Sequence, residues 1–350
     1  MSVYQIKYMD AVPDSAVCNE AVKLAKRHKF AQLSGFVNGV LRNIARNIDS
    51  VQLDTLSIRY SMPQWIVDRF VAAYGEKKAE EIFKAFHNKS TISIRTNLTR
   101  CTPDELRATL EAEGVTVTAV DELNYAFVIS GFDYLNGLQS FRDGLFYVQD
   151  ISSMLVAQTA APKKGDYVID VCAAPGGKST HIAELLQGSG HVLARDLTDN
   201  KVDMIEENIE RHGLNNMSAE VWDATVPDAD SAGKADILIC DLPCSGLGVL
   251  GRKKDIRYKM TPESVDELAA LQRQILDTVH TYVKPNGVLV YSTCTIDEAE
   301  NEDNVRWFIE KHPEFELDKN FAEGTGMKQI LPGEHGSDGF FIARFIKSKL

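Results

Sequence analysis

The 350-residue chain is predicted to fold as a doubly wound α/β protein preceded by two smaller parts. Two observations predict this class. From residue 146 onward, short apolar runs rich in Val, Ile and Leu alternate with helical stretches, as parallel strands joined by helices do. Several of these runs end in polar or cysteine-containing motifs, and open α/β sheets bind their ligands at the carboxyl ends of strands. The sequence therefore predicts a ligand site along one edge of a parallel sheet.

The hydrophobic pattern assigns the elements of this part, residues 146–350. The predicted strands cover residues 167–172, 191–196, 218–222, 235–241 and 287–294. The predicted helices cover residues 178–187, 200–212, 262–283 and 299–311. A last apolar run at 339–346 is expected to pair at the edge of the sheet.

Two smaller parts precede this sheet. Residues 1–50 predict helices between 15 and 48, a piece too short to bury its apolar faces alone. Residues 51–145 predict a small α+β module. It begins with a helical stretch from 62 to 86, and Thr102 then caps a helix that has Pro103 at its first position. The strands predicted for this module are 91–97, 115–118, 126–130 and 144–148.

Composition and charge limit the functional classes. The chain is 44% hydrophobic and 25% charged, as globular proteins are, and it shows neither a signal peptide nor a membrane-spanning run. Its net charge of −12 argues against a nucleic-acid partner. However, the densest basic run, 251–259, begins seven residues after Cys244 and is suited to a local phosphate contact. The six cysteines lack a compact spacing, which predicts reduced thiols in the cytoplasm and no metal site.

A glycine turn follows the first strand of the sheet, in the sequence from Asp170 to Thr180. Gly176 and Gly177 allow the backbone to approach a ligand closely, with a helix N-terminus behind them. The end of this motif resembles a P-loop, but a P-loop requires glycine five residues before Gly177, where the chain has Cys172. A nucleoside cofactor is favoured over a nucleoside triphosphate.

Acidic residues stand at three successive strand ends. Asp196 comes about 20 residues after the glycine turn, where a carboxylate can accept both ribose hydroxyls. Asp223 is placed to meet an adenine amino group, and Asp241 ends the fourth strand. An intact G-x-G-x-x-G motif is missing, so S-adenosylmethionine is favoured over NAD.

Two cysteines follow two other strand ends, Cys244 in Asp-Leu-Pro-Cys-Ser-Gly and Cys294 in Ser-Thr-Cys-Thr. Two thiols brought to one sheet edge suggest covalent catalysis. The alternative is that they are small buried hydrophobic residues, as most free cysteines are. Cys18, Cys101 and Cys240 are assigned to that alternative.

Together, the glycine turn and the two cysteine motifs resemble the RsmB/NSUN family of RNA cytosine-C5 methyltransferases over residues 55–350. Residues 14–23 and 35–42 resemble later helices of a NusB-like domain whose early helices are missing. That combination resembles the RsmB branch, also called Sun or Fmu. The resemblance implies a Rossmann-like class I methyltransferase sheet, an RRM-like module and a partial NusB-like segment. Leu242 and the Arg-Lys-Lys-Asp sequence at 252–255 depart from the commoner family pattern without removing a reactive group.

The resemblance also implies roles. Cys294 is expected to attack cytosine C6, Cys244 to assist loss of the C5 proton and product release, and the presence of both favours RNA over DNA. Asp241 would bind the cytosine edge or the cofactor, and Lys178 would lie near the target nucleotide. The expected cofactor-binding residues are Cys172, Ala173, Ala174, Pro175, Gly176, Gly177, Lys178, Asp196, Asp223 and Asp241.

The expected substrate is 16S rRNA or a small-subunit assembly intermediate, with the protein acting as a cytoplasmic monomer. A tRNA or another rRNA site is the alternative substrate. A non-catalytic RNA-binding or ribosome-assembly factor on the same fold is the alternative class. His335, beside Gly336 to Phe340, is expected to have a structural or RNA-contacting role.

Overall fold

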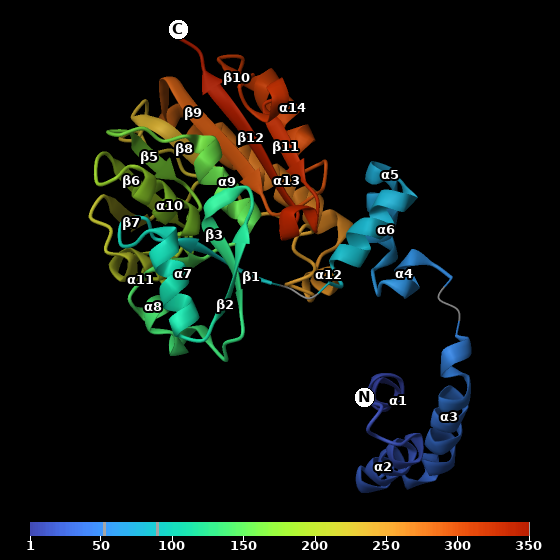
Figure 1. Cartoon of the computed structure of the whole chain (residues 1–350). Coiled ribbons are helices and arrows are strands. Elements are labelled where there is room, and N and C mark those ends of the chain that lie inside the picture. The colour runs from blue at the N-terminus through green and yellow to red at the C-terminus, as the bar shows by residue number, and fades with distance from the viewer. Residues whose placement is uncertain (52–53, 89–90, 350) are drawn as a thin grey trace. The chain divides into compact units, whose positions relative to one another are not determined.

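The computed structural model describes residues 1–51, 54–88 and 91–349, which belong to two compact units. The first unit spans Met1–Ser61 and the second spans Met62–Leu350 (Figure 1). Within the described parts of the chain, every helix is too short or too polar to span a bilayer.

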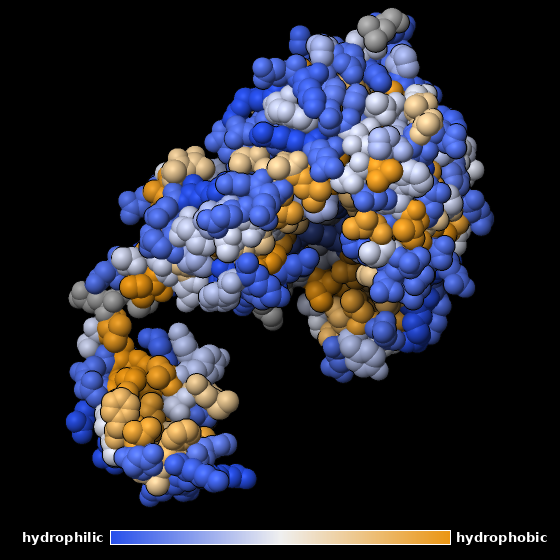
Figure 2. All heavy atoms as spheres, turned by 180° about the vertical axis from the view of Figure 1, so that it is seen from behind, coloured by the Kyte–Doolittle hydropathy of each residue, from blue (hydrophilic) through white to orange (hydrophobic). Residues whose placement is uncertain are grey.

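The first unit is helical. Its helices and 3₁₀ turns are α1 (Ser2–Tyr8), α2 (Asp14–Arg27), η1 (Ala31–Leu33), α3 (Ser34–Asn47), η2 (Ile48–Ser50) and α4 (Leu56–Arg59). Val17 and Cys18 of α2 and Leu41 of α3 are buried, but Phe30 and Phe36 are exposed. Figure 2 shows apolar side chains gathered on one face of this unit. As predicted, so short a piece leaves much of its apolar surface uncovered.

The second unit opens with two helices and a small antiparallel sheet. The helices α5 (Gln64–Tyr74) and α6 (Glu76–Ala85) are separated by Gly75, whose φ of +78° ends the first of them. The sequence predicted one helical stretch here. The small sheet has the order β2-β3-β1-β4, which is that of a ferredoxin-like fold. Its elements are β1 (Ile92–Thr96), α7 (Pro103–Ala112), β2 (Thr116–Val120), β3 (Leu123–Ser130), η3 (Leu135–Gly137), α8 (Gln139–Arg142) and β4 (Phe146–Val148).

A mixed eight-stranded sheet forms the rest of the second unit, in the order β10-β12-β9-β8-β5-β6-β7 with β11 also on β12. The five parallel strands are β5 (Tyr167–Asp170), β6 (His191–Asp196), β7 (Met217–Val221), β8 (Ala235–Asp241) and β9 (Val283–Thr293). The antiparallel strands are β10 (Phe315–Leu317), β11 (Met327–Ile330) and β12 (Phe340–Lys347).

Helices cover both faces of this sheet (Figure 1). The helices α13 (Pro262–Val279) and α14 (Glu302–Lys311) bury side chains in one core layer. The helices α9 (Ile151–Ala160), α10 (Gly177–Leu185) and α11 (Asp199–His212) bury side chains in the other. The remaining elements are α12 (Ile256–Lys259) and the short turns η4 (His280–Tyr282), η5 (Ala322–Gly324) and η6 (Glu334–Gly336).

One expectation for this region needs correction, and three of its elements were not predicted. The run at 339–346 was expected at the sheet edge, but β12 lies inside the sheet, between β9 and the two short strands β10 and β11. The sequence did not predict β10 and β11, because strands of three and four residues carry too little pattern. It also did not predict α9, because this helix is buried on almost every side and therefore lacks a polar face.

A buried arginine joins the small sheet to the large one. Arg95 of β1 is fully buried and pairs with Glu184 of α10. Its Nη2 donates to Thr180 Oγ1 over 3.1 Å, and its Nε donates to Gln149 Oε1 over 2.9 Å. Because a buried guanidinium requires these partners, the small module is held against the helix that begins at the glycine turn.

Candidate active site

The glycine turn lies between the end of β5 and the start of α10, as predicted. Gly176 has a φ of +101°, and a Cβ at Gly177 would lie 3.1 Å from Tyr147 Cε1. The turn is held by Ala173 N–H, which donates to Arg195 O over 2.8 Å. Asp170, buried beneath it, accepts hydrogen bonds from the Ser179 hydroxyl and from Cys172 N–H. Burial raises the pKa of Asp170 to about 7.

Asp196, at the end of β6, lies against this turn. Its Oδ2 accepts a hydrogen bond from Ala174 N–H over 2.9 Å. Its Oδ1 accepts from Leu197 N–H and from Lys201 Nζ, both over 2.8 Å. The structure thus brings Asp196 and the glycine turn together, with Lys201 held on the carboxylate.

Asp223 follows β7 and is exposed. Its Oδ1 accepts from Thr225 N–H and Thr225 Oγ1 over 2.8 and 2.7 Å, and these hydrogen bonds hold its pKa below the ordinary value. The preceding Trp222 N–H donates to Asp196 O over 2.9 Å, which fixes this segment beside the end of β6. The turn itself consists of Cys172, Ala173, Ala174, Pro175 and Gly176. Burial raises the pKa of the Cys172 thiol.

Lys178 and Asp241 form an ion pair at the end of β8. Lys178 Nζ lies 2.6 Å from Asp241 Oδ2, and Ser292 Oγ donates to Asp241 Oδ1 over 2.7 Å. Lys178 Nζ also lies 5.5 Å from the centre of the Phe340 ring. Burial alone would lower the pKa of Lys178, but Asp241 outweighs it and raises this pKa. The lysine therefore carries a positive charge beside the two cysteines.

The two cysteines that follow β8 and β9 meet. Cys244 Sγ lies 3.2 Å from Cys294 Sγ, although the residues are 50 positions apart. Both are free thiols and both are partly exposed. The hydrogen bond from Cys244, together with the positive charge of Lys178, lowers the pKa of Cys294, whereas the same contact raises the pKa of Cys244. Cys294 is therefore the thiol that ionises first.

A buried polar cluster behind the cysteines was not predicted from the sequence. Glu300 is fully buried and accepts hydrogen bonds from Ser245 N–H over 2.8 Å and from Gln272 Nε2 over 2.9 Å. Gln272 also donates to Pro243 O over 2.8 Å, and Ser245 Oγ lies 2.9 Å from Thr295 Oγ1. The cluster fixes the residues on both sides of Cys244, but its members are too far apart in sequence to form a motif.

Some residues of the basic run at 251–259 form ion pairs or are buried within the protein. Arg252 bridges Asp150 and Asp338 over 2.9 and 2.7 Å, and Arg257 is buried. Lys253 and Lys254 are exposed. His335 pairs with Glu122 over 2.5 Å.

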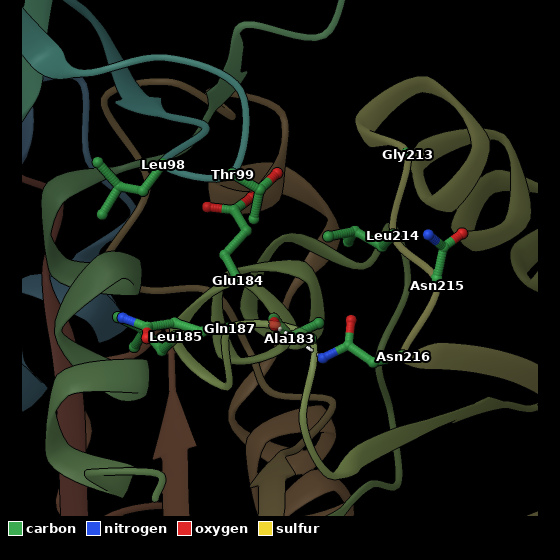
Figure 3. A pocket seen from close by; sticks show the side chains of 11 residues that line it. Leu98, Thr99, Ala183, Glu184, Leu185, Gln187, Gly213, Leu214, Asn215 and Asn216 are labelled. Carbon is green, nitrogen blue, oxygen red and sulfur yellow. Dashed lines mark hydrogen bonds between the residues drawn. The ribbon is translucent and has the colours of Figure 1, made fainter. Parts of the chain in front are cut away.

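A cavity of about 420 Å³ lies elsewhere, at the carboxyl end of α10 (Figure 3). Leu98 and Thr99 line it on one side and Leu214 to Asn216 on the other. Because the glycine turn lies at the opposite end of the same helix, this cavity is separate from the cysteine site.

The strand order, the glycine turn and the strand-end residues define a class I methyltransferase. A model of the family described as 16S rRNA methyltransferase RsmB/F matches residues 157–346. A NusB-family model matches residues 1–46, and the ferredoxin-like domain of RsmF/B-like methyltransferases matches residues 62–132. The chain belongs to the RsmB/F family of S-adenosylmethionine-dependent RNA cytosine-C5 methyltransferases.

Relatives are similar over almost the whole chain. A protein of Bacillus subtilis named probable ribosomal RNA small subunit methyltransferase B is 38% identical, over 99% of this chain and 81% of its own length. Ribosomal RNA small subunit methyltransferase B of Shewanella oneidensis is 32% identical, over 99% and 80%. Among solved structures, a methyltransferase homolog protein of Pyrococcus horikoshii is 26% identical with a TM-score of 0.70, over 83% of this chain and 97% of its own.

Proposed function

We propose that this protein methylates C5 of a cytosine in 16S rRNA through a covalent adduct between Cys294 and cytosine C6. The observation that carries this proposal is the 3.2 Å separation of the Cys244 and Cys294 sulfur atoms beside the Lys178–Asp241 pair. Cytosine C5 is a poor nucleophile. Addition of a thiolate at C6 makes C5 electron-rich, so that it can accept a methyl group.

Cys294 acts as the nucleophile because its thiol ionises first of the two. Its pKa is lowered by the hydrogen bond from Cys244, while Lys178 adds a positive charge nearby. Asp241 accepts a hydrogen bond from the cytosine amino group, and Lys178 holds Asp241 in place for that contact. The target base must leave its stack to reach these groups.

Cys244 completes the reaction. While Cys294 is a thiolate, its hydrogen bond and its charge keep the Cys244 pKa high. Once the Cys294 sulfur is bonded to C6, that charge is gone and Cys244 can ionise. The Cys244 thiolate then takes the proton from methylated C5, the electron pair of the C5–H bond forms the C5=C6 double bond, and the Cys294 sulfur leaves C6 as thiolate.

The residues of the glycine turn fit the cofactor of the family. The backbone of the turn from Ala174 to Gly177 and the helix N-terminus of α10 would hold the cofactor. Asp196 would hold the ribose hydroxyls, and the Asp223 segment would hold the adenine. S-adenosylmethionine supplies the electrophilic methyl group.

The 16S rRNA target is supported by the names of the relatives at 32–38% identity, which are small-subunit ribosomal RNA methyltransferases. Lys253 and Lys254, exposed a few residues after Cys244, provide charge for the RNA backbone.

The test incubates the full chain with S-adenosylmethionine labelled in its methyl group and with 16S rRNA, small-subunit particles, 23S rRNA or tRNA. Label is expected at one cytosine C5 of 16S rRNA. Label in tRNA or 23S rRNA alone would refute the 16S target but not the chemistry. RNA binding without label in any fraction would instead establish a non-catalytic assembly factor.

A further inference from the structure

A second cluster of reactive side chains lies on the α13–α14 face of the large sheet. Asp277 lies in the last turn of α13, His280 opens η4, and His312 follows α14. One donor atom from each of these three residues lies within 4.8 Å of the others. His312 Nε2 and Asp277 Oδ1 are 3.1 Å apart, and Glu314 Oε1 lies 3.8 Å from His280 Nε2. Two imidazoles and the Asp277 carboxylate therefore converge on one point, and Glu314 lies beside them.

The histidines of this cluster are oriented as metal ligands are. His280 Nδ1 lies 2.8 Å from Asp277 O, so its N–H donates to that carbonyl and its Nε2 keeps a free lone pair. His312 is 6% exposed, and its buried Nε2 makes no hydrogen bond with any described residue. The two rings are only 3.9 Å apart between centres, a separation that disfavours two charged imidazoliums.

The Asp277 carboxylate is held with one oxygen toward His312. Lys311 Nζ lies 2.9 Å from Asp277 Oδ2, which orients this carboxylate and leaves Oδ1 toward His312. In a tetrahedral zinc site with nitrogen and oxygen ligands, donor atoms lie about 3.4 Å apart. The donor atoms of Asp277, His280 and His312 lie within 4.8 Å of one another, so they would have to approach by at most about 1.4 Å to reach that geometry.

The cluster lies at the opposite end of β9 from Cys294. η4 leads directly into Val283, the first residue of β9, whereas Cys294 follows the last residue of the same strand. The four residues also join segments that are far apart in sequence, the end of α13 and the connection from α14 to β10. A bound ion there would tie these segments together without touching the substrate.

We propose that Asp277, His280 and His312, with Glu314 beside them, form a structural site for Zn²⁺ or a similar divalent transition-metal ion. Sequence spacing did not indicate this site, because His280 and His312 are 32 positions apart and only the fold brings them together. Imidazole with carboxylate ligands suits zinc and cobalt, and neither carbonyl-rich calcium nor thiolate-rich iron–sulfur chemistry fits this donor set.

The test titrates chelator-treated full-length protein with Co²⁺. Because two adjacent thiols are suitable ligands for soft metals, the titration uses a Cys244→Ser/Cys294→Ser background. In this background, cobalt bound by nitrogen and oxygen shows visible absorption without a sulfur charge-transfer band. One equivalent is expected to bind and to be displaced by Zn²⁺. Zn²⁺ in about 100-fold excess over its dissociation constant should raise the unfolding midpoint by about 5 °C.

Matched variants decide whether the cluster binds the ion. Asp277→Asn keeps the size of the side chain and His312→Ala removes an imidazole, and each should weaken cobalt binding by about 100-fold. His28→Ala, which removes an exposed histidine of the first unit, should bind as the parent does. If His312→Ala does not fold, as judged by circular dichroism, Asp277→Asn alone decides. Absence of a cobalt band below millimolar concentration, or equal binding in Asp277→Asn, would overturn the proposal.

Discussion

Asp241 of β8 and Ser292 of β9 are partners on adjacent parallel strands, and the Ser292 hydroxyl donates to the Asp241 carboxylate over 2.7 Å. Cys244 lies three residues beyond Asp241, and Cys294 lies two residues beyond Ser292. The pairing of these two strands therefore places both thiols at one point. The proposed reaction depends on that proximity, and the following predictions test its parts.

Substitution of each cysteine should give a different defect. Cys294→Ala should lower methylation at least about 1,000-fold and form no covalent RNA adduct, because the nucleophile is lost. Cys244→Ala should accumulate an adduct that survives denaturing gel electrophoresis, because attack proceeds but resolution stalls. Cys101→Ala is the control and should behave as the parent protein. An adduct formed by Cys294→Ala would show that the two roles are reversed.

The reactivity of Cys294 should depend on Cys244 in a pH-dependent manner. The hydrogen bond from Cys244 lowers the pKa of Cys294, so the thiolate persists to lower pH than in an ordinary cysteine. Removing the donor in Cys244→Ala should raise this pKa and move the inflection of iodoacetamide alkylation to higher pH. Peptide mapping by mass spectrometry measures the alkylation rate at Cys294 alone. An unchanged or lower inflection would contradict the proposed contact.

Lys178 should be required for the rate of reaction. Lys178→Met removes the positive charge beside Cys294 and the partner of Asp241, and we expect methylation to fall about 100-fold under single-turnover conditions. Lys178→Arg keeps the charge and should retain part of the activity. Lys163→Met, at an exposed lysine, is the control. Full activity of Lys178→Met would remove this residue from the mechanism.

Glu300 should hold the Cys244 loop. Glu300→Ala leaves Ser245 N–H and the Gln272 amide without their buried acceptor, and we expect the free energy of unfolding to fall by about 2–4 kcal/mol in urea titrations. Glu298→Ala removes an exposed carboxylate five positions after the end of β9 and should change stability by less than about 0.5 kcal/mol. Equal stability of the two variants would count against the structural role of Glu300.

Sequence patterns predicted the parts of this fold that have a clear period or motif. The five parallel strands, the capped helix after Thr102 and the glycine turn all follow local rules. The helix α9 was missed because it is buried on nearly all sides, and β12 was placed at the edge because its short partner strands gave no signal. Both errors arise where tertiary packing, not local pattern, determines the structure.

The residues of the candidate site were likewise predictable only where they belong to a local motif. Cys244, Cys294 and the strand-end aspartates could be found because each follows a recognisable strand. Glu300, Gln272 and the histidines of the α13–α14 face could not, because they come together only through the packing of helices on the sheet. Residues that contact a site but lie far from its motifs in the sequence form no recognisable motif of their own.

The pairing of Asp241 with Ser292 has a consequence for variation among related proteins. The chain between the two cysteine motifs crosses over the sheet through α12 and α13. The positions of the motifs are determined by the backbone hydrogen bonds between β8 and β9. Insertions or deletions in that crossover can therefore be absorbed at its surface while Cys244 and Cys294 keep their geometry. A shift of β9 by even one residue along β8 would instead separate the two cysteines. Their proximity therefore depends on the register of the sheet rather than on the length of the loops.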